Sequence, residues 1–326
     1  MTTAPRPIAL SVIIAVVGGK DCLRRCLAAL CPQIDFSEHE IIVPYDHWSR
    51  EVAELHSEFP AVRFHEIRDA ATAPAPSLRA FAHQRYDCRR AVGLGLARGE
   101  LLALTEDYAV PAADWCRRVL QVHEQPYSVI GGAIDNGVDR ALNWALYYCD
   151  FGRYGRPLTP QPAAYVSDVN VAYKRSALEA VRALWCESYH ETSVHWALQA
   201  RGEVLFLDPR LVVQQHRPPI SFRRAYRERI DWGRAFAQTR AAAGSGWRRL
   251  VYAASAPLLP VLLLARAVHH MGRQGRSIAQ MTTTIPLVFG LLTGWAWGEF
   301  LGYAATARGP QPDAAAPAAG VQPATR

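Results

Sequence analysis

Hydrophobic residues in the first half of the chain fall into short runs, separated by stretches in which they recur at helical spacing. Apolar runs predict buried strands at residues 8–17, 40–43 and 101–105, and residues 62–67 are a further candidate strand. Helical spacing predicts helices over residues 22–30 and 89–97. Strands that alternate with helices in this way predict a doubly wound α/β fold around a parallel sheet.

The last third of the chain is more apolar and lacks this alternation. Residues 250–265 carry no charge, but Pro257 and Pro260 interrupt them. Residues 277–298 are also uncharged, and as a helix they would extend about 33 Å, enough to cross a hydrocarbon core of about 30 Å. We therefore expect the second run to cross a membrane and the first to lie in its interface or to re-enter it. A tilted, kinked crossing is the alternative for the first run. Two buried core helices in a soluble protein are the alternative.

These patterns predict three parts along the chain. Residues 1–235 are expected to form an α/β catalytic domain, in which residues 70–76 form an Ala/Pro-rich loop. Residues 236–308 are expected to form interfacial and transmembrane helices. The Ala/Pro-rich residues 309–326 are expected to be a disordered tail.

The charge of the chain is positive and comes mostly from arginine. The net charge is +7, and residues 210–280 hold thirteen arginines against two acids, Glu228 and Asp231. Such a basic stretch beside apolar runs suits a membrane surface or a ligand that carries phosphate. Since no helix-turn-helix, RNP or zinc-finger pattern accompanies it, we do not expect nucleic acid as a partner.

The cysteines and the N-terminus bear on the compartment. The seven cysteines are dispersed, without a CxxC pair, and are typical of reduced thiols in the cytosol. Residues 1–17 lack the pattern of a signal peptide. We therefore expect the catalytic domain on the cytoplasmic face of the inner membrane.

Two acidic residues, Glu106 and Asp107, follow directly after the predicted strand at 101–105. Ligands of parallel sheets bind beyond the carboxyl ends of the strands, and Asp46 follows the strand at 40–43 at the same edge. A carboxylate pair of this kind can hold Mg²⁺ or Mn²⁺ on a diphosphate. A helix cap or a solvated turn is the alternative for the pair.

A second acidic candidate is Glu191, which opens a predicted helix directly after His190. A carboxylate near a helix N-terminus is stabilised by the helix dipole, so a capping role is one interpretation. If Glu191 faces a bound sugar instead, it can act as a general base that removes the proton of an acceptor hydroxyl.

Taken together and in order, several segments resemble family 2 glycosyltransferases of the GT-A fold. They include the apolar strand at 11–14 with the helix at 23–30, residues 40–43, the small residues of 90–99, residues 104–115 with Pro111 and Trp115, and residues 168–175. The segment Trp297-x-Glu299-x-x-Gly302-Tyr303 resembles the ends of membrane-bound members. The resemblance covers about residues 8–303 and implies a mixed, Rossmann-like sheet.

The resemblance also implies a function and roles for single residues. It implies an inverting transfer of sugar from a nucleotide-diphospho-sugar donor to an acceptor hydroxyl, with Glu191 as the base. The residues expected at the donor are Asp46, Arg90, Glu106 and Asp107, the last two also as ligands of Mg²⁺ or Mn²⁺. The residues expected at the acceptor are Asp168, Asn170, His190, Arg229 and Trp232. The apolar C-terminal region and its arginines suggest a lipid-linked or membrane-proximal acceptor.

The chain departs from the family pattern at its donor motifs. Tyr108 stands where the last acid of the Asp-x-Asp motif is expected, and the usual second acid after the second strand is absent around Asp46. These departures leave a catalytically inactive glycosyltransferase-like membrane scaffold as the alternative function. A membrane-associated nucleotidyltransferase is a further alternative, for which the short Gly18-Gly19-Lys20 segment would have to bind phosphate.

Overall fold

A computed structural model describes residues 7–68, 78–242 and 246–305. The loop predicted at residues 70–76 and the tail predicted at 309–326 lie outside the described residues. The chain divides into two compact units, one comprising Met1–Pro219 with Arg273–Gly275 and the other Ile220–Gly272 with Arg276–Arg326. The division falls at Pro219, before the domain boundary predicted at residue 235, and it assigns the helix that begins at Phe222 to the C-terminal unit.

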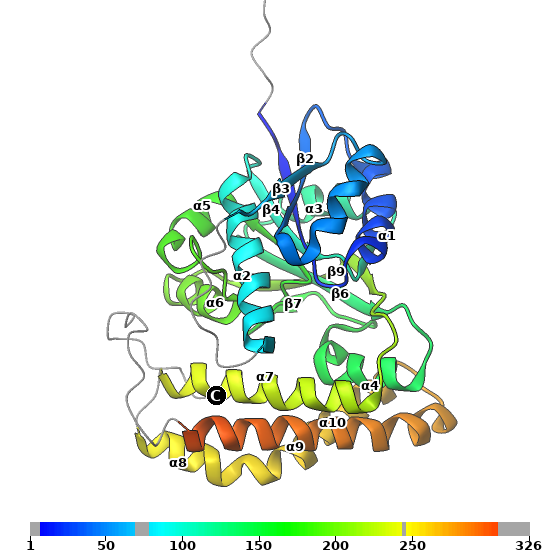
Figure 1. The fold of residues 1–326 in the computed structure, drawn as a ribbon, viewed down its shortest axis with the longest axis vertical. Helices are drawn as coiled ribbons and strands as arrows, with labels where there is room; N and C mark the ends of the chain where they lie inside the picture. The colour runs from blue at the N-terminus through cyan, green and yellow to red at the C-terminus, as the bar shows by residue number, and fades with distance from the viewer. Residues whose placement is uncertain (1–6, 69–77, 243–245, 306–326) are drawn as a thin grey trace, which may run out of the picture. The chain divides into compact units, whose positions relative to one another are not determined.

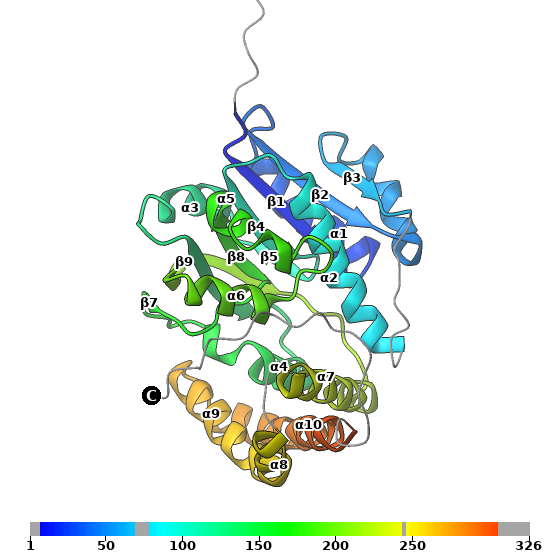
Figure 2. The same ribbon diagram turned by 90° about the vertical axis from the view of Figure 1, so that its left-hand side faces the viewer.

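The N-terminal unit is built on one mixed sheet, which has nine strands within the described residues. Its order is β3-β2-β1-β4-β8-β6-β9-β5, and β7 pairs with β9. The strands are β1 (Leu10–Ala15), β2 (His39–Tyr45), β3 (Arg63–Glu66), β4 (Leu101–Glu106), β5 (Ala109–Pro111), β6 (Val129–Asn136), β7 (Gln161–Pro162), β8 (Asn170–Lys174) and β9 (Leu205–Gln215). The strands β1, β2, β3 and β4 run parallel (Figure 2), whereas β8 is antiparallel to both β4 and β6. The structure confirms the predicted α/β class with a mixed sheet.

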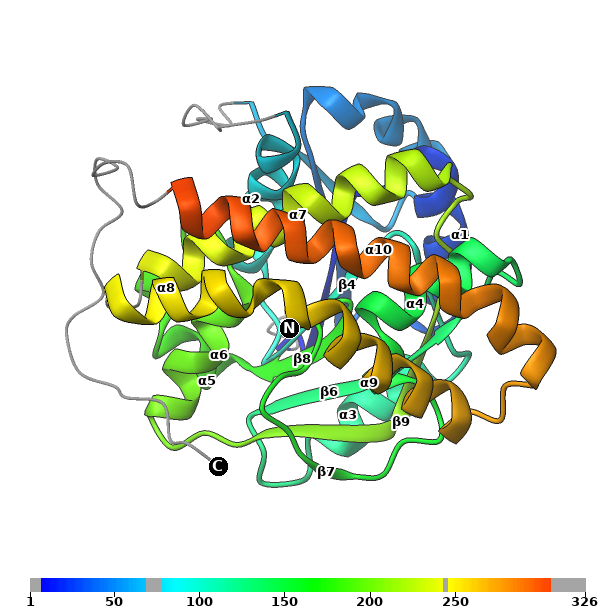
Figure 3. The same ribbon diagram turned by 90° about the horizontal axis from the view of Figure 1, so that it is seen from below.

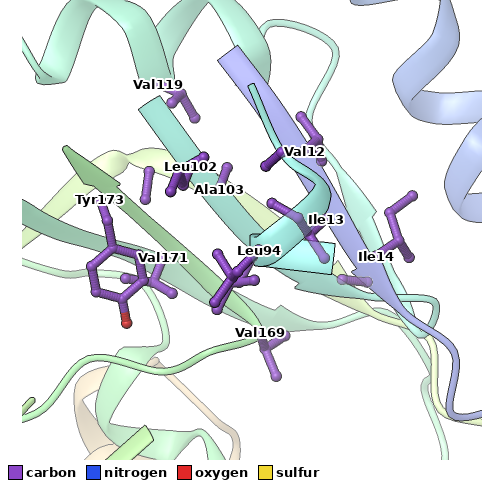
Figure 4. Close-up of a cluster of buried hydrophobic side chains, with 14 of the residues drawn as sticks. Val12, Ile13, Ile14, Leu94, Leu102, Ala103, Val119, Val169, Val171 and Tyr173 are labelled. Atoms are coloured by element: carbon purple, nitrogen blue, oxygen red, sulfur yellow. The ribbon is translucent and has the colours of Figure 1, made fainter. Parts of the chain in front are cut away.

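Helices cover both faces of this sheet. They are α1 (Lys20–Leu30), α2 (Leu78–Leu96), α3 (Trp115–Val122), α4 (Ala141–Asp150), α5 (Arg175–Glu179) and α6 (Glu191–Ala200). Figure 1 shows α2 on one side of the sheet and α1 and α3 on the other. All six residues of β1 and the middle of β4 are buried, and Figure 4 shows them beside Leu94 and Val119. Burial on both faces explains why these strands are continuous apolar runs in the sequence.

One edge of the sheet collects polar side chains from several segments. The parallel strands β1, β2 and β4 end there at Ala15, Tyr45 and Glu106. The antiparallel β8 begins at the same edge, where Asn170 pairs with Thr105 of β4. The fold therefore brings residues from the first two hundred positions of the chain to one edge, which we call the carboxyl edge.

The C-terminal unit consists of helices. They are α7 (Phe222–Ala242), α8 (Gly246–Ser255), α9 (Leu259–Arg273) and α10 (Ile278–Ala305). Figure 3 shows α10 running alongside α7. The segments Gly246–Arg273 and Ile278–Ala305 are each 28 residues long and, by length and composition alone, apolar enough to cross a membrane. Core helices of soluble proteins share these properties, so the segments are weak evidence for membrane association.

Candidate functional site

Asp107 lies at the carboxyl edge, fully enclosed by the segment that follows β1. Its Oδ1 accepts hydrogen bonds from the backbone N–H groups of Val17 and Gly18, both at 3.0 Å. Its Oδ2 accepts from Gly18 at 2.9 Å and from Gly19 at 3.0 Å. Burial raises the pKa of Asp107 to about 7 against the opposing effect of these N–H groups. The side chain therefore fixes the turn between β1 and α1.

Tyr108 packs against the same turn. A Cβ atom at Gly18 would overlap the Tyr108 ring, so only glycine fits at this position. Gly19 has a φ of 90°, which glycine adopts without strain. The Gly18-Gly19 pair is thus explained by close packing against Asp107 and Tyr108 and does not need a phosphate ligand.

Arg90 on α2 is surrounded by three acids, one on α2 itself and two from other segments of the unit. Its Nη2 lies 2.9 Å from Asp168 Oδ2 and 3.9 Å from Glu106 Oε2, and its Nη1 lies 3.4 Å from Asp87 Oδ1. Burial opposes the charged form of Arg90, but these carboxylates outweigh it and raise its pKa. Gln215 also donates to Glu106 Oε1 at 2.6 Å. Arg90 therefore joins the end of β4 to the segment that precedes β8.

Glu191 lies at the start of α6, next to Asp168. Its Oε2 accepts a 3.3 Å hydrogen bond from the backbone N–H of Asp168, and its side chain is 28% exposed. Burial raises the pKa of Glu191 well above its ordinary value, and the Asp168 carboxylate raises it further. A partly exposed carboxylate that binds a proton more strongly than usual suits a general base.

A buried chain of polar groups lies behind Glu191. His195, one turn further along α6, places its Nδ1 4.0 Å from Glu191 Oε1. Its Nε2 lies 2.8 Å from the hydroxyl of Tyr173, which in turn lies 2.6 Å from the hydroxyl of Tyr189. Burial lowers the pKa of His195 to about 4, so its imidazole is neutral at physiological pH. These hydrogen bonds hold α6 against β8 and so fix the position of the helix that carries Glu191.

Asp46 is also at the carboxyl edge, but its carboxylate forms an ion pair with a neighbouring arginine, Arg89. Arg89 Nη2 lies 2.7 Å from Asp46 Oδ1, and Arg89 Nε donates to Oδ2 at 3.2 Å. Burial opposes ionisation of Asp46, yet the hydrogen bonds from Arg89 dominate and lower its pKa below the ordinary value. Arg89 also donates to the Val16 carbonyl. The pair ties α2 to the ends of β1 and β2, and the half-buried Arg85 lies 4.0 Å from the same carboxylate.

The residues expected at the acceptor differ in their burial and in their hydrogen-bond partners. Asn170 is buried, accepts from the Trp115 indole at 2.9 Å, and donates to the carbonyls of Ala133 and Leu211 at 2.9 and 3.1 Å. Its amide thus joins β8 to β6, β9 and α3. His190 is half-buried at the N-cap of α6, and its Nδ1 lies 3.3 Å from Ser193 Oγ.

Arg229 and Trp232 lie on α7 and therefore belong to the C-terminal unit. The Arg229 guanidinium lies over the Trp232 ring, 4.1 Å from its centroid. Arg229 is buried within the structure. This contact gives both side chains a packing role on α7.

The predicted metal site is not supported by the residues that would form it. Both oxygens of Asp107 each accept two N–H bonds, and the partial positive charge of these groups disfavours a cation. Glu106 is engaged by Gln215, and Tyr108 supplies no carboxylate. Within the described residues, no cluster of three or more His, Cys, Asp or Glu side chains could hold a metal ion. The donor set as folded does not fit Mg²⁺ or Mn²⁺.

Solved structures with a similar backbone fold include a mannosyltransferase and TarS. A mannosyltransferase from Pyrobaculum calidifontis, in complex with GDP-Man and Mn²⁺, is 14% identical with a TM-score of 0.48, over 95% of this chain and 79% of that one. TarS from S. aureus is 11% identical with a TM-score of 0.44, over 71% of this chain and 64% of that one. TarS in complex with UDP-GlcNAc is 11% identical with a TM-score of 0.45, over 68% of this chain and 65% of that one.

The likeness is one of fold. No protein-family model matches the sequence, and no curated protein matches it either.

Sequence reasoning identified the acids of the carboxyl edge but missed most of their partners. Asp87, Gln215 and His195 contact the expected residues Arg90, Glu106 and Glu191. Tyr173 and Tyr189 follow His195 in a row of hydrogen-bonded groups. The i,i+4 spacing of Glu191 and His195 on one helix was the available signal for His195. The i,i+3 spacing of Asp87 and Arg90 on α2 was a similar signal. Gln215 and Tyr173 lie far away in sequence from Glu106 and Glu191, and only the pairing of the strands brings them to the site.

Proposed function

We propose that this chain transfers a sugar from a nucleotide-diphospho-sugar donor to an acceptor hydroxyl with inversion, using the carboxyl edge of the sheet. The observation that carries this proposal is the Glu191 carboxylate, which is partly exposed, raised in pKa and set beside Asp168 at this edge. The resemblance of segments 8–303 to family 2 glycosyltransferases supports the same assignment.

In the proposed reaction, Glu191 removes the proton of the acceptor hydroxyl as the oxygen attacks the anomeric carbon. The bond from that carbon to the diphosphate oxygen breaks, and its electron pair leaves with the nucleoside diphosphate. Attack from the face opposite the leaving group inverts the configuration. The proton remains on Glu191, whose raised pKa favours holding it.

The negative charge on the departing diphosphate must be neutralised by cations, and family 2 glycosyltransferases usually use a divalent metal ion for this. Because the residues around Asp107 do not fit such an ion, the proposed reaction includes no metal. Burial raises the pKa of Glu106 and of Tyr108, and the half-buried Arg217, which follows β9, lies close enough to both groups to oppose that rise. A guanidinium here can neutralise phosphate oxygens, so we assign the diphosphate to this side of the edge.

We further propose that the acceptor is lipid-linked or close to a membrane, on the cytoplasmic side of the inner membrane. The support is the composition of the C-terminal unit, where long apolar segments alternate with arginines. No part of the catalytic proposal depends on this location.

A membrane scaffold without catalysis is the second candidate, and one observation favours it. Asp46 is occupied by Arg89, and Asp107 by backbone N–H groups, so two of the expected donor-binding acids already have internal partners. A scaffold of this kind would bind no nucleotide-sugar.

Glu191→Gln tests the assignment of the base. With a donor found by a thermal-shift screen over nucleotide-sugars, we expect the variant to bind that donor normally and to lose about 10²- to 10⁴-fold in kcat, the usual contribution of a general base. The matched control is Glu187→Gln, an exposed acid just before α6, which should behave as wild type.

Two results would count against the proposal, and they differ in what they remove. Full activity in a folded Glu191→Gln protein would remove Glu191 as the base and leave sugar transfer standing. Absence of any thermal shift with any nucleotide-sugar, together with absence of product, would favour the scaffold.

A further inference from the structure

One face of α10 consists of glycines that lie directly on α7. Gly290, Gly294, Gly298 and Gly302 recur at four-residue intervals, which places them on one side of the helix. A Cβ at Gly290 would lie 2.8 Å from the Phe222 ring, and one at Gly294 would lie 3.0 Å from the Tyr226 ring. A Cβ at Gly298 would overlap the Ile230 carbonyl, and one at Gly302 would lie 2.7 Å from the Ala237 side chain.

The contact is therefore close along much of both helices. The α7 residues that the four glycines meet advance in the same direction as the glycines, so the helices run parallel (Figure 3). Gly233 on α7 completes the fit, because a Cβ there would overlap the Trp295 carbonyl. Small residues that let two backbones approach in this way form a lasting helix pair.

The partner helix is too charged to enter hydrocarbon. Within its 21 residues α7 carries six arginines and two acids. Four of the arginines are exposed, Arg223, Arg224, Arg227 and Arg234. Charged side chains at membrane depth are strongly unfavourable unless they are paired within a protein. Because residues 290–302 of α10 lie on α7, α10 cannot cross a bilayer while this pair is intact.

The connected helices α8 and α9 show the opposite character. Their exposed apolar residues recur at helical spacing, and with Leu258 in the 3-10 turn (Ala256–Leu258) between the two helices they form one stripe. The stripe comprises Trp247 (73% exposed), Leu250 (59%), Val251 (45%), Leu258 (70%), Val261 (65%) and Leu262 (51%). A contiguous apolar surface of this kind marks an interaction site. Exposed Arg248 and Arg266 lie within the same two helices.

We propose that the C-terminal unit attaches to an anionic bilayer in the plane of its surface, with the α8–α9 stripe inserted into one leaflet and no helix crossing. The occupant is a lipid surface because arginines accompany the apolar stripe, and cations beside an apolar helix face attract anionic headgroups. The attachment replaces the predicted crossing by residues 277–298. It does not depend on sugar transfer.

Flotation with preformed vesicles tests the attachment on the full chain. The protein should float with vesicles of phosphatidylcholine and phosphatidylglycerol and bind phosphatidylcholine alone more weakly. Leu258→Glu with Val261→Glu should reduce the bound fraction by about tenfold or more. The control, Val204→Glu, places one glutamate at an exposed valine of the N-terminal unit and should bind normally; the single variant Val261→Glu, which adds the same charge to the stripe, should bind more weakly than this control.

Side-specific labelling distinguishes in-plane attachment from crossing. Single cysteines replace Gly246, Ser277 and Ala305, which lie at the start of α8, between α9 and α10, and at the end of α10. In sealed inner-membrane vesicles an impermeant maleimide should label all three from the same side, as read by mass spectrometry of each peptide. Protection of Ser277→Cys alone would mean two crossings, and protection of Ala305→Cys alone would mean one. Either result overturns the proposal.

Two further outcomes are informative. A dimer that buries the stripe and fails to float would show that a second copy covers this surface, which also overturns the proposal. Glu191→Gln should float like wild type, so loss of sugar transfer and loss of attachment are separate results.

Discussion

Asp107 and Glu191 are two acids at the same edge of one sheet, and the structure gives them opposite surroundings. Asp107 is enclosed, with four hydrogen bonds from three backbone N–H groups. Glu191 is 28% exposed and accepts a longer hydrogen bond, of 3.3 Å, from the Asp168 N–H. Burial raises the pKa of both. The difference shows that hydrogen-bond partners, more than position at a strand end, separate a structural acid from an available one.

Two consecutive arginines extend this comparison. Arg89 and Arg90 are neighbours on α2, where successive side chains point in directions about 100° apart. Arg89 joins Asp46 near the ends of β1 and β2, whereas Arg90 joins Asp168 beside Glu191. On the Asp46 side the charges cancel internally. On the Glu191 side three acids surround one arginine, so a carboxylate remains that can exchange a proton.

The largest effect that would sharpen the comparison is on stability, in Asp107→Asn. The amide would point N–H donors at the backbone N–H groups of the 17–19 turn and leave at least one of them unsatisfied. We expect a loss of about 2–4 kcal/mol in the free energy of unfolding, the cost of one or two buried unpaired polar groups. Urea unfolding followed by circular dichroism measures it.

The control is Asp21→Asn, since Asp21 is an acid on the neighbouring helix whose side chain is 88% exposed. Its effect should stay within about 0.5 kcal/mol. An Asp107→Asn protein as stable as wild type would mean that the turn does not need the carboxylate, and the contrast with Glu191 would weaken.

Much of the N-terminal fold could be predicted from the sequence, because the strands are buried on both faces. The continuous apolar runs predicted β1, β2 and β4 to within two residues at each end. The start of α6 at Glu191 was also predicted. These features depend on local pattern, which a single sequence contains.

The partners of the acids could not be predicted, because they depend on pairing between distant segments. Asp46 and Arg89 are 43 positions apart, and Gln215 and Glu106 are 109 apart. The sequence predicted Asp168 at the acceptor, but no local pattern indicated that the antiparallel β8 sets it beside Arg90 and Glu191. The four-residue spacing of glycines in α10 was a readable signal for close helix packing. The apolar composition of the same residues predicted a membrane crossing, and the glycine spacing was therefore not used.

A smaller expected effect concerns the pH dependence of activity. Glu191 must be ionised to act as a base, so its raised pKa places the acid limb of kcat/KM above the ordinary range of a carboxylate. The Asp168 charge contributes to that rise. Asp168→Asn removes the charge, so the acid limb should move to lower pH. An unmoved limb in an active, folded variant would remove Asp168 from control of Glu191.

The smallest expected effect is that of a chelator, and it tests the enclosed acid directly. If Asp107 keeps its four hydrogen bonds during turnover, it has no lone pair for a cation, and EDTA should leave both donor binding and kcat unchanged. Activity that EDTA abolishes and Mn²⁺ restores would mean that the 17–19 turn opens and that Asp107 exchanges N–H groups for a metal. In that event donor binding and the stability of the turn would be coupled, and Asp107→Asn would impair catalysis as severely as Glu191→Gln. Both acids would then take part in catalysis. Glu191 would do so in the structure as folded, and Asp107 only after the 17–19 turn opens.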